Sequence, residues 1–161
     1  MLKFLNKKKN DNKGFSLVEL IIVVAILAIL VGLLAPQYLK YVEKSRKSAD
    51  ASNLDEMVRA IQVYAADAEE TLPADTYTIT INKTATTVQA NVVANKTQAE
   101  KALAATAPDW AKTKLKSNKW EVGTTNATSV SAEITVAQDG GTTVKYTPAS
   151  LADYINKTAA Q

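Results

Sequence analysis

The sequence contains no cysteine and no histidine. Without cysteine the chain forms no disulfide, carries no thiol nucleophile and attaches no c-type haem. Without histidine it lacks the side chain that titrates near neutral pH, and the two absences together exclude any Cys/His zinc site. We therefore expect no enzyme, no metal site and no cofactor, and we expect a function in structure or binding.

The composition is otherwise that of an ordinary folded protein. Charged residues make up 22% and apolar residues 47% of the 161 residues, a balance that excludes wholesale disorder. The length fits one domain, or one domain with an appendage.

The positive charge is concentrated at the N-terminus. The chain has 19 Lys and Arg against 16 Asp and Glu, a net charge of +3, which would suggest a nucleic acid or an anionic membrane as partner. Residues 1–14 hold five of the lysines and one aspartate, so the remaining 147 residues carry 14 basic and 15 acidic side chains, a net charge of −1. The basic balance belongs to a short leader, and no nucleic-acid partner is indicated.

A long apolar segment follows the leader at residues 15–35 and ends at Pro36. A helix of these 21 residues is ~31 Å long at ~1.5 Å per residue, about the hydrocarbon thickness of a bilayer. Because the lysines precede this segment, the positive-inside rule keeps residues 1–14 in the cytoplasm and exports the rest. The sequence therefore predicts a single-pass membrane protein with a large exported part.

Two ordinary interpretations compete for this segment. A secretory signal peptide would have a shorter apolar core and a small-x-small cleavage site after it, and no such site follows residue 35. A plain signal anchor fits the hydropathy, but the segment contains Glu19. A carboxylate in a spanning helix costs about 2.5–3.5 kcal/mol on insertion scales, which makes Glu19 a functional candidate.

The residues around Glu19 form a third pattern, Lys13-Gly14-Phe15-Ser16-Leu17-Val18-Glu19-Leu20. This pattern resembles the class III signal of type IV pilins and pilin-like proteins, and the resemblance covers roughly residues 9–50. It implies that a membrane-bound prepilin peptidase cuts between Gly14 and Phe15 and N-methylates the new Phe15. It also implies that Phe15 and Glu19 are the residues of filament assembly.

Elementary electrostatics supports that role for Glu19. Cleavage would expose a cationic α-amine at Phe15, and two opposite charges at low effective dielectric attract by several kcal/mol. An incoming Glu19 would be neutralised by the Phe15 amine of a neighbouring subunit, which would set the offset between subunits. The alternative is a Glu19 that extends to the lipid headgroups.

Gly32 and Pro36 are predicted to kink the helix where it leaves the membrane. Proline removes a backbone hydrogen bond and glycine lowers helix propensity. The alternative is that the membrane helix ends there.

The predicted fold class is α+β, a long helix packed on a small antiparallel sheet. We expect a cleaved leader at 1–14, an apolar membrane or filament-core helix at 15–36, an amphipathic second half at 37–72 and a β-rich head at 73–161. A single helix is expected from Phe15 to about Glu70. The apolar positions of its second half follow helical spacing: Leu54, Met57, Val58, Ile61, Tyr64, Ala65 and Ala68.

The head is predicted from shorter patterns. Alternation predicts strands at 76–82 and 86–93 and a hairpin joining 130–136 to 144–146 across Gly140 and Gly141. Thr97 and Glu100 form a capping box for a helical insertion at 97–107. Two further sets of residues are assigned to ordinary roles: Trp110 and Trp120 to the core or an intersubunit contact, and Asp67, Glu69, Glu70 and Asp75 to solvated surface in preference to calcium binding.

These patterns predict a structural subunit that polymerises into an extracellular type IV pilus serving adhesion, surface motility or biofilm formation. The resemblance implies partners in the prepilin peptidase, an assembly ATPase, an inner-membrane platform protein and minor pilins. The precursor would sit in the cytoplasmic membrane before it joins the pilus on the cell surface. Two alternatives remain, a pseudopilin of a type II secretion or competence system, and a membrane-anchored binding domain that never polymerises.

Overall fold

The computed structural model describes residues 16–67 and 72–159, with side chains up to residue 156. The chain divides into two compact units, Met1–Lys40 and Tyr41–Gln161. The second half of the long helix therefore belongs to the same unit as the head, and the division falls four residues after Pro36.

The helix α1 spans Leu17–Ala66, 50 residues with Pro36 inside it. It is ~75 Å long at ~1.5 Å per residue. The expectation of one long helix is confirmed, and the alternative that the membrane helix ends at Pro36 is wrong. The helix ends at Ala66, earlier than the predicted Glu70, and Asp67 lies outside it. Phe15, the expected first residue, lies outside the described residues.

The head is built on a four-stranded antiparallel sheet in the order β2-β1-β5-β6. The strands are β1 (Asp75–Asn82), β2 (Thr86–Ala90), β5 (Ser129–Val136) and β6 (Thr142–Thr147). β1 lies between β2 and β5, with Ile79 opposite Val88 on one side and opposite Ala132 on the other. The predicted α+β class is confirmed.

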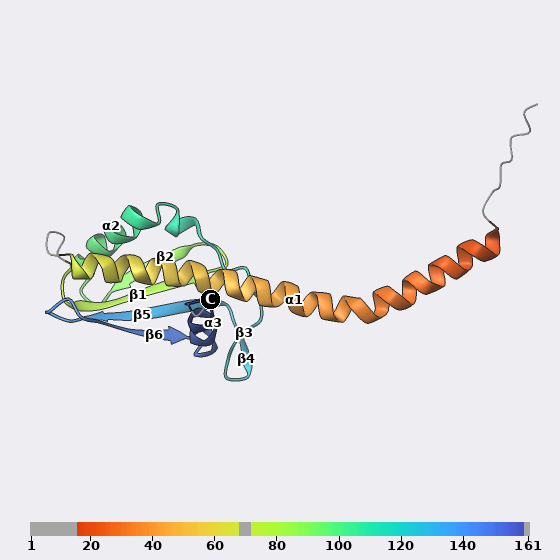
Figure 1. Cartoon of the computed structure of the whole chain (residues 1–161). Coiled ribbons are helices and arrows are strands. Elements are labelled where there is room, and N and C mark those ends of the chain that lie inside the picture. Colours follow the sequence, from red (N-terminus) through yellow and green to blue (C-terminus); the bar gives the residue numbers. More distant parts are fainter. Residues whose placement is uncertain (1–15, 68–71, 160–161) are drawn as a thin grey trace, which may run out of the picture. The chain divides into compact units, whose positions relative to one another are not determined.

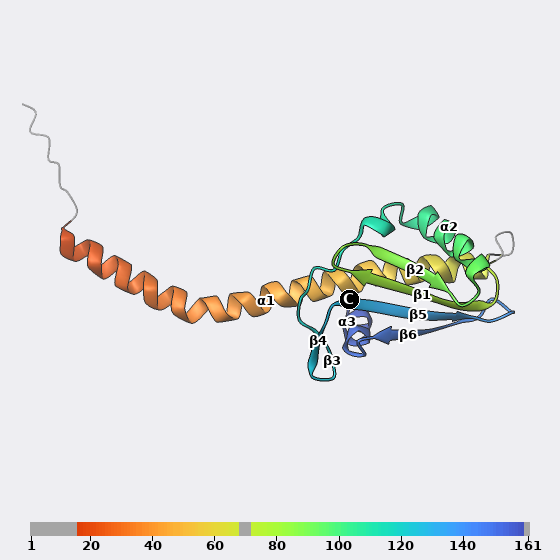
Figure 2. The same ribbon diagram turned by 180° about the vertical axis from the view of Figure 1, so that it is seen from behind.

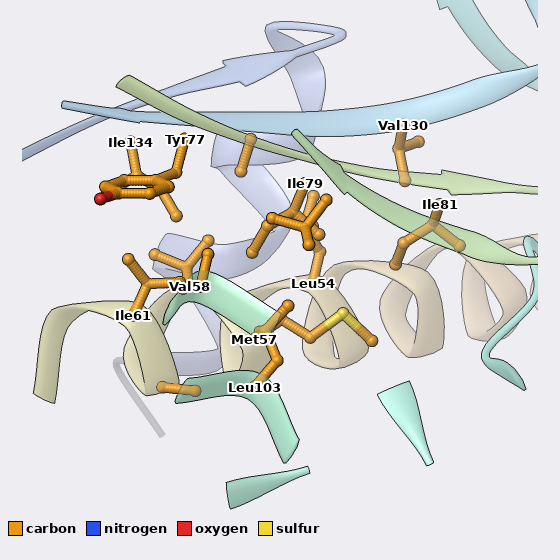
Figure 3. Packing of buried hydrophobic residues seen from close by; sticks show 14 of the residues in the cluster. Leu54, Met57, Val58, Ile61, Tyr77, Ile79, Ile81, Leu103, Val130 and Ile134 are labelled. Carbon is orange, nitrogen blue, oxygen red and sulfur yellow. The ribbon is translucent and has the colours of Figure 1, made fainter. Parts of the chain in front are cut away.

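One face of this sheet packs on α1 (Figures 1 and 2). Alternate strand residues point to the helix, because side chains in a strand alternate between the two faces. The predicted helical stripe meets them, and Leu103 of α2 (Lys96–Thr106) closes the cluster. Ten members of this cluster are labelled in Figure 3: Leu54, Met57, Val58, Ile61, Tyr77, Ile79, Ile81, Leu103, Val130 and Ile134.

Tyr77 shows how a polar atom is accommodated in this core. Its side chain is fully buried, and its hydroxyl donates a hydrogen bond of 2.7 Å to the carbonyl oxygen of Pro73. Burial raises the pKa of Tyr77 to about 12, with a further contribution from the negative charge of Asp75. Tyr77 therefore remains neutral at every pH at which the protein is expected to work.

The capping box predicted at Thr97 and Glu100 is wrong. A short 3-10 turn, η1 (Val93–Asn95), leads directly into α2, so the helix begins at Lys96 and Thr97 lies inside its first turn. The side-chain amide of Asn95 donates to Asp75, 2.9 Å away, and makes no cap. Glu100 forms an ion pair with Lys96 at 3.5 Å instead.

The remaining elements lie beside the sheet. η2 (Trp110–Lys112) follows α2, a separate two-stranded hairpin pairs β3 (Trp120–Val122) with β4 (Thr125–Ala127), and α3 (Ser150–Ala159) ends the described chain. Leu151 of α3 is fully buried, and the ring of Tyr154 meets the ring of Trp120 edge-on at 5.4 Å between centroids.

Two glycines, Gly123 and Gly140, have positive φ, and comparing them tests whether the β5–β6 turn depends on its contact with α1. Gly140, with φ +80°, lies in the β5–β6 turn against the end of α1, and a Cβ there would lie 2.9 Å from the carbonyl oxygen of Ala65. Gly123, with φ +63°, has no atom within 4 Å of that position. We expect Gly123→Ala to lower the free energy of unfolding by about 1 kcal/mol through backbone strain. Gly140→Ala is expected to lower it by about 1–3 kcal/mol more through overpacking.

Urea unfolding of the full chain in detergent micelles, followed by tryptophan fluorescence, measures the difference. Equal losses in the two variants would show that the β5–β6 turn does not depend on its contact with α1.

Candidate assembly surface

The part of α1 that lies in the first unit is an apolar cylinder. Its large side chains are exposed to between 48% at Leu30 and 73% at Leu17, and they occur on every side of the helix. The 18-residue window that is apolar enough to cross a membrane has none of its residues buried inside the chain. A surface of this kind is unfavourable in water, so it must be covered by lipid or by other protein.

Glu19 caps the start of this cylinder. Ser16 directly precedes the helix, and Oε2 of Glu19 accepts a hydrogen bond of 2.8 Å from the backbone N–H of Ser16. This is the carboxylate half of a capping box, in which the third helical residue reaches back to the N-cap. The spacing Ser-x-x-Glu predicts it, but the sequence reasoning assigned Glu19 to charge pairing alone. Within residues 14–39, Glu19 is the only charged side chain.

The other predicted site residues are not brought to Glu19. Gly14 and Phe15 lie outside the described residues, so their geometry stays a prediction. Gly32 and Pro36 lie ~20 Å and ~26 Å farther along the helix. A Cβ at Gly32 would have no atom within 4 Å, so nothing in the described chain requires a glycine there. The kink at these two residues stays a prediction.

A second polar site lies in the head around Asp50, which is fully buried on α1. Its Oδ1 accepts the backbone N–H of Lys116 at 2.8 Å. Its Oδ2 accepts the backbone N–H of Ser117 at 2.9 Å and the indole N–H of Trp120 at 3.0 Å. Three donors compensate for the cost of burying one carboxylate.

Neighbouring residues extend this clamp along α1. Glu43 accepts a hydrogen bond from the hydroxyl of Ser117 and lies 3.8 Å from Arg46. The ammonium of Lys47 lies over the ring of Trp120, 5.1 Å from its centroid. Segment 113–120 is therefore held against residues 43–50 of α1 by hydrogen bonds and by a cation–π contact.

Sequence reasoning missed Asp50 because it stands in a polar stretch of α1 that reads as solvated. It correctly assigned Trp120, which is fully buried. Trp110 is only partly buried and packs against the edge of the core.

The acidic residues predicted to be solvated near the C-terminal end of α1 differ in their exposure. Asp67 is exposed, Glu69 and Glu70 lie outside the described residues, and Asp75 is partly buried. The carboxylate of Asp75 accepts bonds from the backbone N–H groups of Val92 and Thr76 and from the amide of Asn95. Burial by itself would raise the pKa of Asp75, but these hydrogen bonds outweigh it and hold the pKa below its usual value.

The interpretation as simple solvated surface is therefore wrong for Asp75, which organises the β1–α2 connection. Within 16–67 and 72–156, no group of three acidic side chains is placed to hold a metal ion.

Comparison with known proteins supports the N-terminal site in particular. Residues 9–35 match the family model of the prokaryotic N-terminal methylation motif. Two proteins described as type IV major fimbrial protein FimA from Dichelobacter nodosus are each 42% identical over 62 residues, and a third is 40% identical over the same length. These alignments cover 38% of this chain and about two fifths of the relatives' length. No solved structure matches the chain.

The Asp50 clamp can be tested by its contribution to stability. Asp50→Ala leaves three buried N–H groups without their acceptor, and we expect a loss of about 3 kcal/mol or more in the free energy of unfolding. Asp50→Asn keeps one acceptor oxygen and is expected to lose less. Glu56→Ala, an exposed carboxylate on the same helix, is the matched control and is expected to change it by less than about 0.5 kcal/mol.

The measurement is chemical unfolding of the purified full chain in micelles. An Asp50→Ala variant as stable as the Glu56→Ala control would contradict a structural role for the clamp.

Proposed function

We propose that this chain is a type IV pilin, the subunit of an extracellular filament built from many copies. One observation carries the proposal: an uncovered apolar helix whose start is capped by Glu19, within the segment that matches the N-terminal methylation motif. A helix of this kind has two environments that can cover it, a bilayer before assembly and other copies after it.

In this proposal a prepilin peptidase removes residues 1–14 and N-methylates Phe15. The precursor spans the cytoplasmic membrane with its N-terminus inside and its head outside. An assembly ATPase and a platform protein then move it from the membrane into the filament, where minor pilins accompany it. The resemblance of residues 9–50 to type IV pilins supports these steps.

Glu19 has two roles in this scheme. In the membrane it satisfies the backbone N–H of Ser16, which would otherwise be an unpaired donor at the helix start. During assembly its charge would pair with the Phe15 amine of a neighbouring subunit. The apolar cylinder could slide along its neighbours without a large change in energy, so a single charge pair fixes the offset between copies.

A major pilin is favoured over a pseudopilin because the relatives at 40–42% identity are described as major fimbrial proteins. We propose that the filament serves adhesion, surface motility or biofilm formation.

The processing step is tested at the mature N-terminus. We expect mass spectrometry of filaments sheared from cells to find a 147-residue chain that starts at Phe15 and carries one additional methyl group. Gly14→Val, which enlarges the residue before the proposed cut, should leave the precursor uncut. A full-length chain with intact Met1 in surface filaments would refute the proposal.

Two substitutions separate the two roles of Glu19. Glu19→Ala removes both the cap and the charge, and we expect surface filaments to fall at least tenfold. Glu19→Gln removes the charge but keeps an oxygen that can accept the N–H of Ser16. If charge pairing drives assembly, Glu19→Gln fails as Glu19→Ala does.

Filament yield is measured by electron microscopy and by the amount of subunit in the sheared fraction, with immunoblots for subunit in the membrane. Full yield from Glu19→Gln would leave capping as the only role. Normal yield from Glu19→Ala would exclude Glu19 from assembly.

A further inference from the structure

The head carries opposite charges at the two ends of its helix. At the end near residue 44 lies a group of lysines from two segments, here called the basic patch: Lys44, Lys47, Lys114, Lys116 and Lys119. At the other end lie Asp67, Asp75 and Asp139, here called the acidic end.

The Asp50 clamp builds the basic patch. In the extended segment 113–117, Leu115 and Ser117 are buried while Lys114 and Lys116 are exposed. The alternation is fixed because Asp50 holds the N–H groups of Lys116 and Ser117. The lysines on either side of Ser117 therefore point outward beside those of α1.

The nearby helix carboxylates leave these lysines uncompensated. Asp50 is fully buried and Glu43 bonds to Ser117 and Arg46, so both face the clamp. Four ion pairs occur in the part of the chain that the structure describes, and none involves a lysine of the basic patch. Glu121, in the following hairpin, is the exposed carboxylate closest in sequence.

The β5–β6 turn builds the acidic end. Gly140 lies against the backbone of Ala65, which brings Asp139 to the C-terminal end of α1. Asp67 and Asp139 line one shallow hollow there. Asp75 begins β1 opposite Val136, next to the same turn, and its hydrogen bonds keep it ionised.

The two groups are too far apart to neutralise each other within one head. Lys47 and Asp67 are 20 residues apart on α1 and the residue that follows it, so they are separated by ~30 Å. That distance is about three Debye lengths at 0.1 M salt.

We infer that the basic patch binds the acidic end of a second copy of this chain, head to tail along the filament. The inference rests on the proposed polymer, in which all copies point the same way. A contact between two different surfaces of the same chain can repeat from copy to copy, and it extends into an open filament where the rotation between copies does not close into a ring. The charges on each copy provide both halves of this contact, although the chain beyond residue 14 is nearly neutral overall.

The structure favours this partner over nucleic acid or lipid. Trp120, which lies under Lys47, is fully buried and offers no face for base stacking, and a nucleic acid would leave the acidic end without a role. An anionic bilayer would complement the basic patch but would leave the acidic end without a role.

The test is zero-length cross-linking of intact sheared filaments. A carbodiimide joins a lysine to a carboxylate only when the two are in contact. We expect cross-linked peptides that join Lys114, Lys116 or Lys119 to Asp67 or Asp139. Because the Lys116 backbone is held at Asp50, which is 17 residues or ~26 Å along the helix from Asp67, such a link must connect two subunits. Filaments whose cross-links never join the two groups would overturn the inference and leave the pilin proposal intact, whereas an absence of filaments would refute the pilin proposal itself.

Charge reversal supplies an independent measurement. Lys116→Glu with Lys119→Glu changes only exposed side chains and is expected to lower filament yield about tenfold, since like charges would then face each other. Adding Asp67→Lys and Asp139→Lys should restore it. Lys145→Glu, on the opposite face of the sheet, is the control and should leave the yield unchanged.

Unchanged yield in the Lys116/Lys119 variant would contradict the inference. If that variant also lowered the amount of precursor retained in the membrane, the basic patch would be a lipid-headgroup site instead.

Discussion

The structure depends on one constraint, an apolar helix surface that residues 16–67 and 72–159 leave uncovered. Residues 20–34 of α1 are all exposed in the described chain, and their side chains are apolar on every side of the helix. In lipid the helix is stable, because all its backbone groups are paired internally. In water it is stable only beside other helices of the same kind. This part of α1 therefore needs an apolar environment that the described chain does not supply.

The head meets a different requirement, since it must be stable without disulfides. A single apolar cluster between α1 and the sheet provides most of this stability. Asp50 adds three hydrogen bonds to these apolar contacts. Because hydrogen bonds are directional, they fix the orientation of segment 113–120 as well as its distance from the helix. Trp120 and Tyr154 then connect this segment to α3.

Much of the fold could be predicted from the sequence because its signals are local. The continuous apolar run of α1, its stripe from Leu54 to Ile61 and the alternation in β1 and β5 each depend on periodicity within one element. The predicted cap of α2 was wrong because the 3-10 turn η1 leads directly into the helix, so Lys96 is its first residue and Thr97 lies inside its first turn. The order of the strands could not be predicted, since β1 pairs with a strand about 50 residues away.

The two candidate sites, at Glu19 and at Asp50, also differ in whether their signal in the sequence is local. Glu19 was found because a carboxylate in an apolar run is conspicuous. Asp50 was not found, because its partners lie 66 to 70 residues away and nothing in its own neighbourhood distinguishes it from a solvated aspartate.

The alternation of buried and exposed residues in segment 113–117 affects how the charge of the basic patch can change during evolution. The side chains of Leu115 and Ser117 are buried and contribute to stability, whereas the side chains of Lys114 and Lys116 are exposed and do not enter the core. Mutation can therefore alter or reverse the outward charges while stability is preserved. Two lineages that share this head could therefore differ in the charge of this face through a few exposed positions, with no change in the protein's architecture.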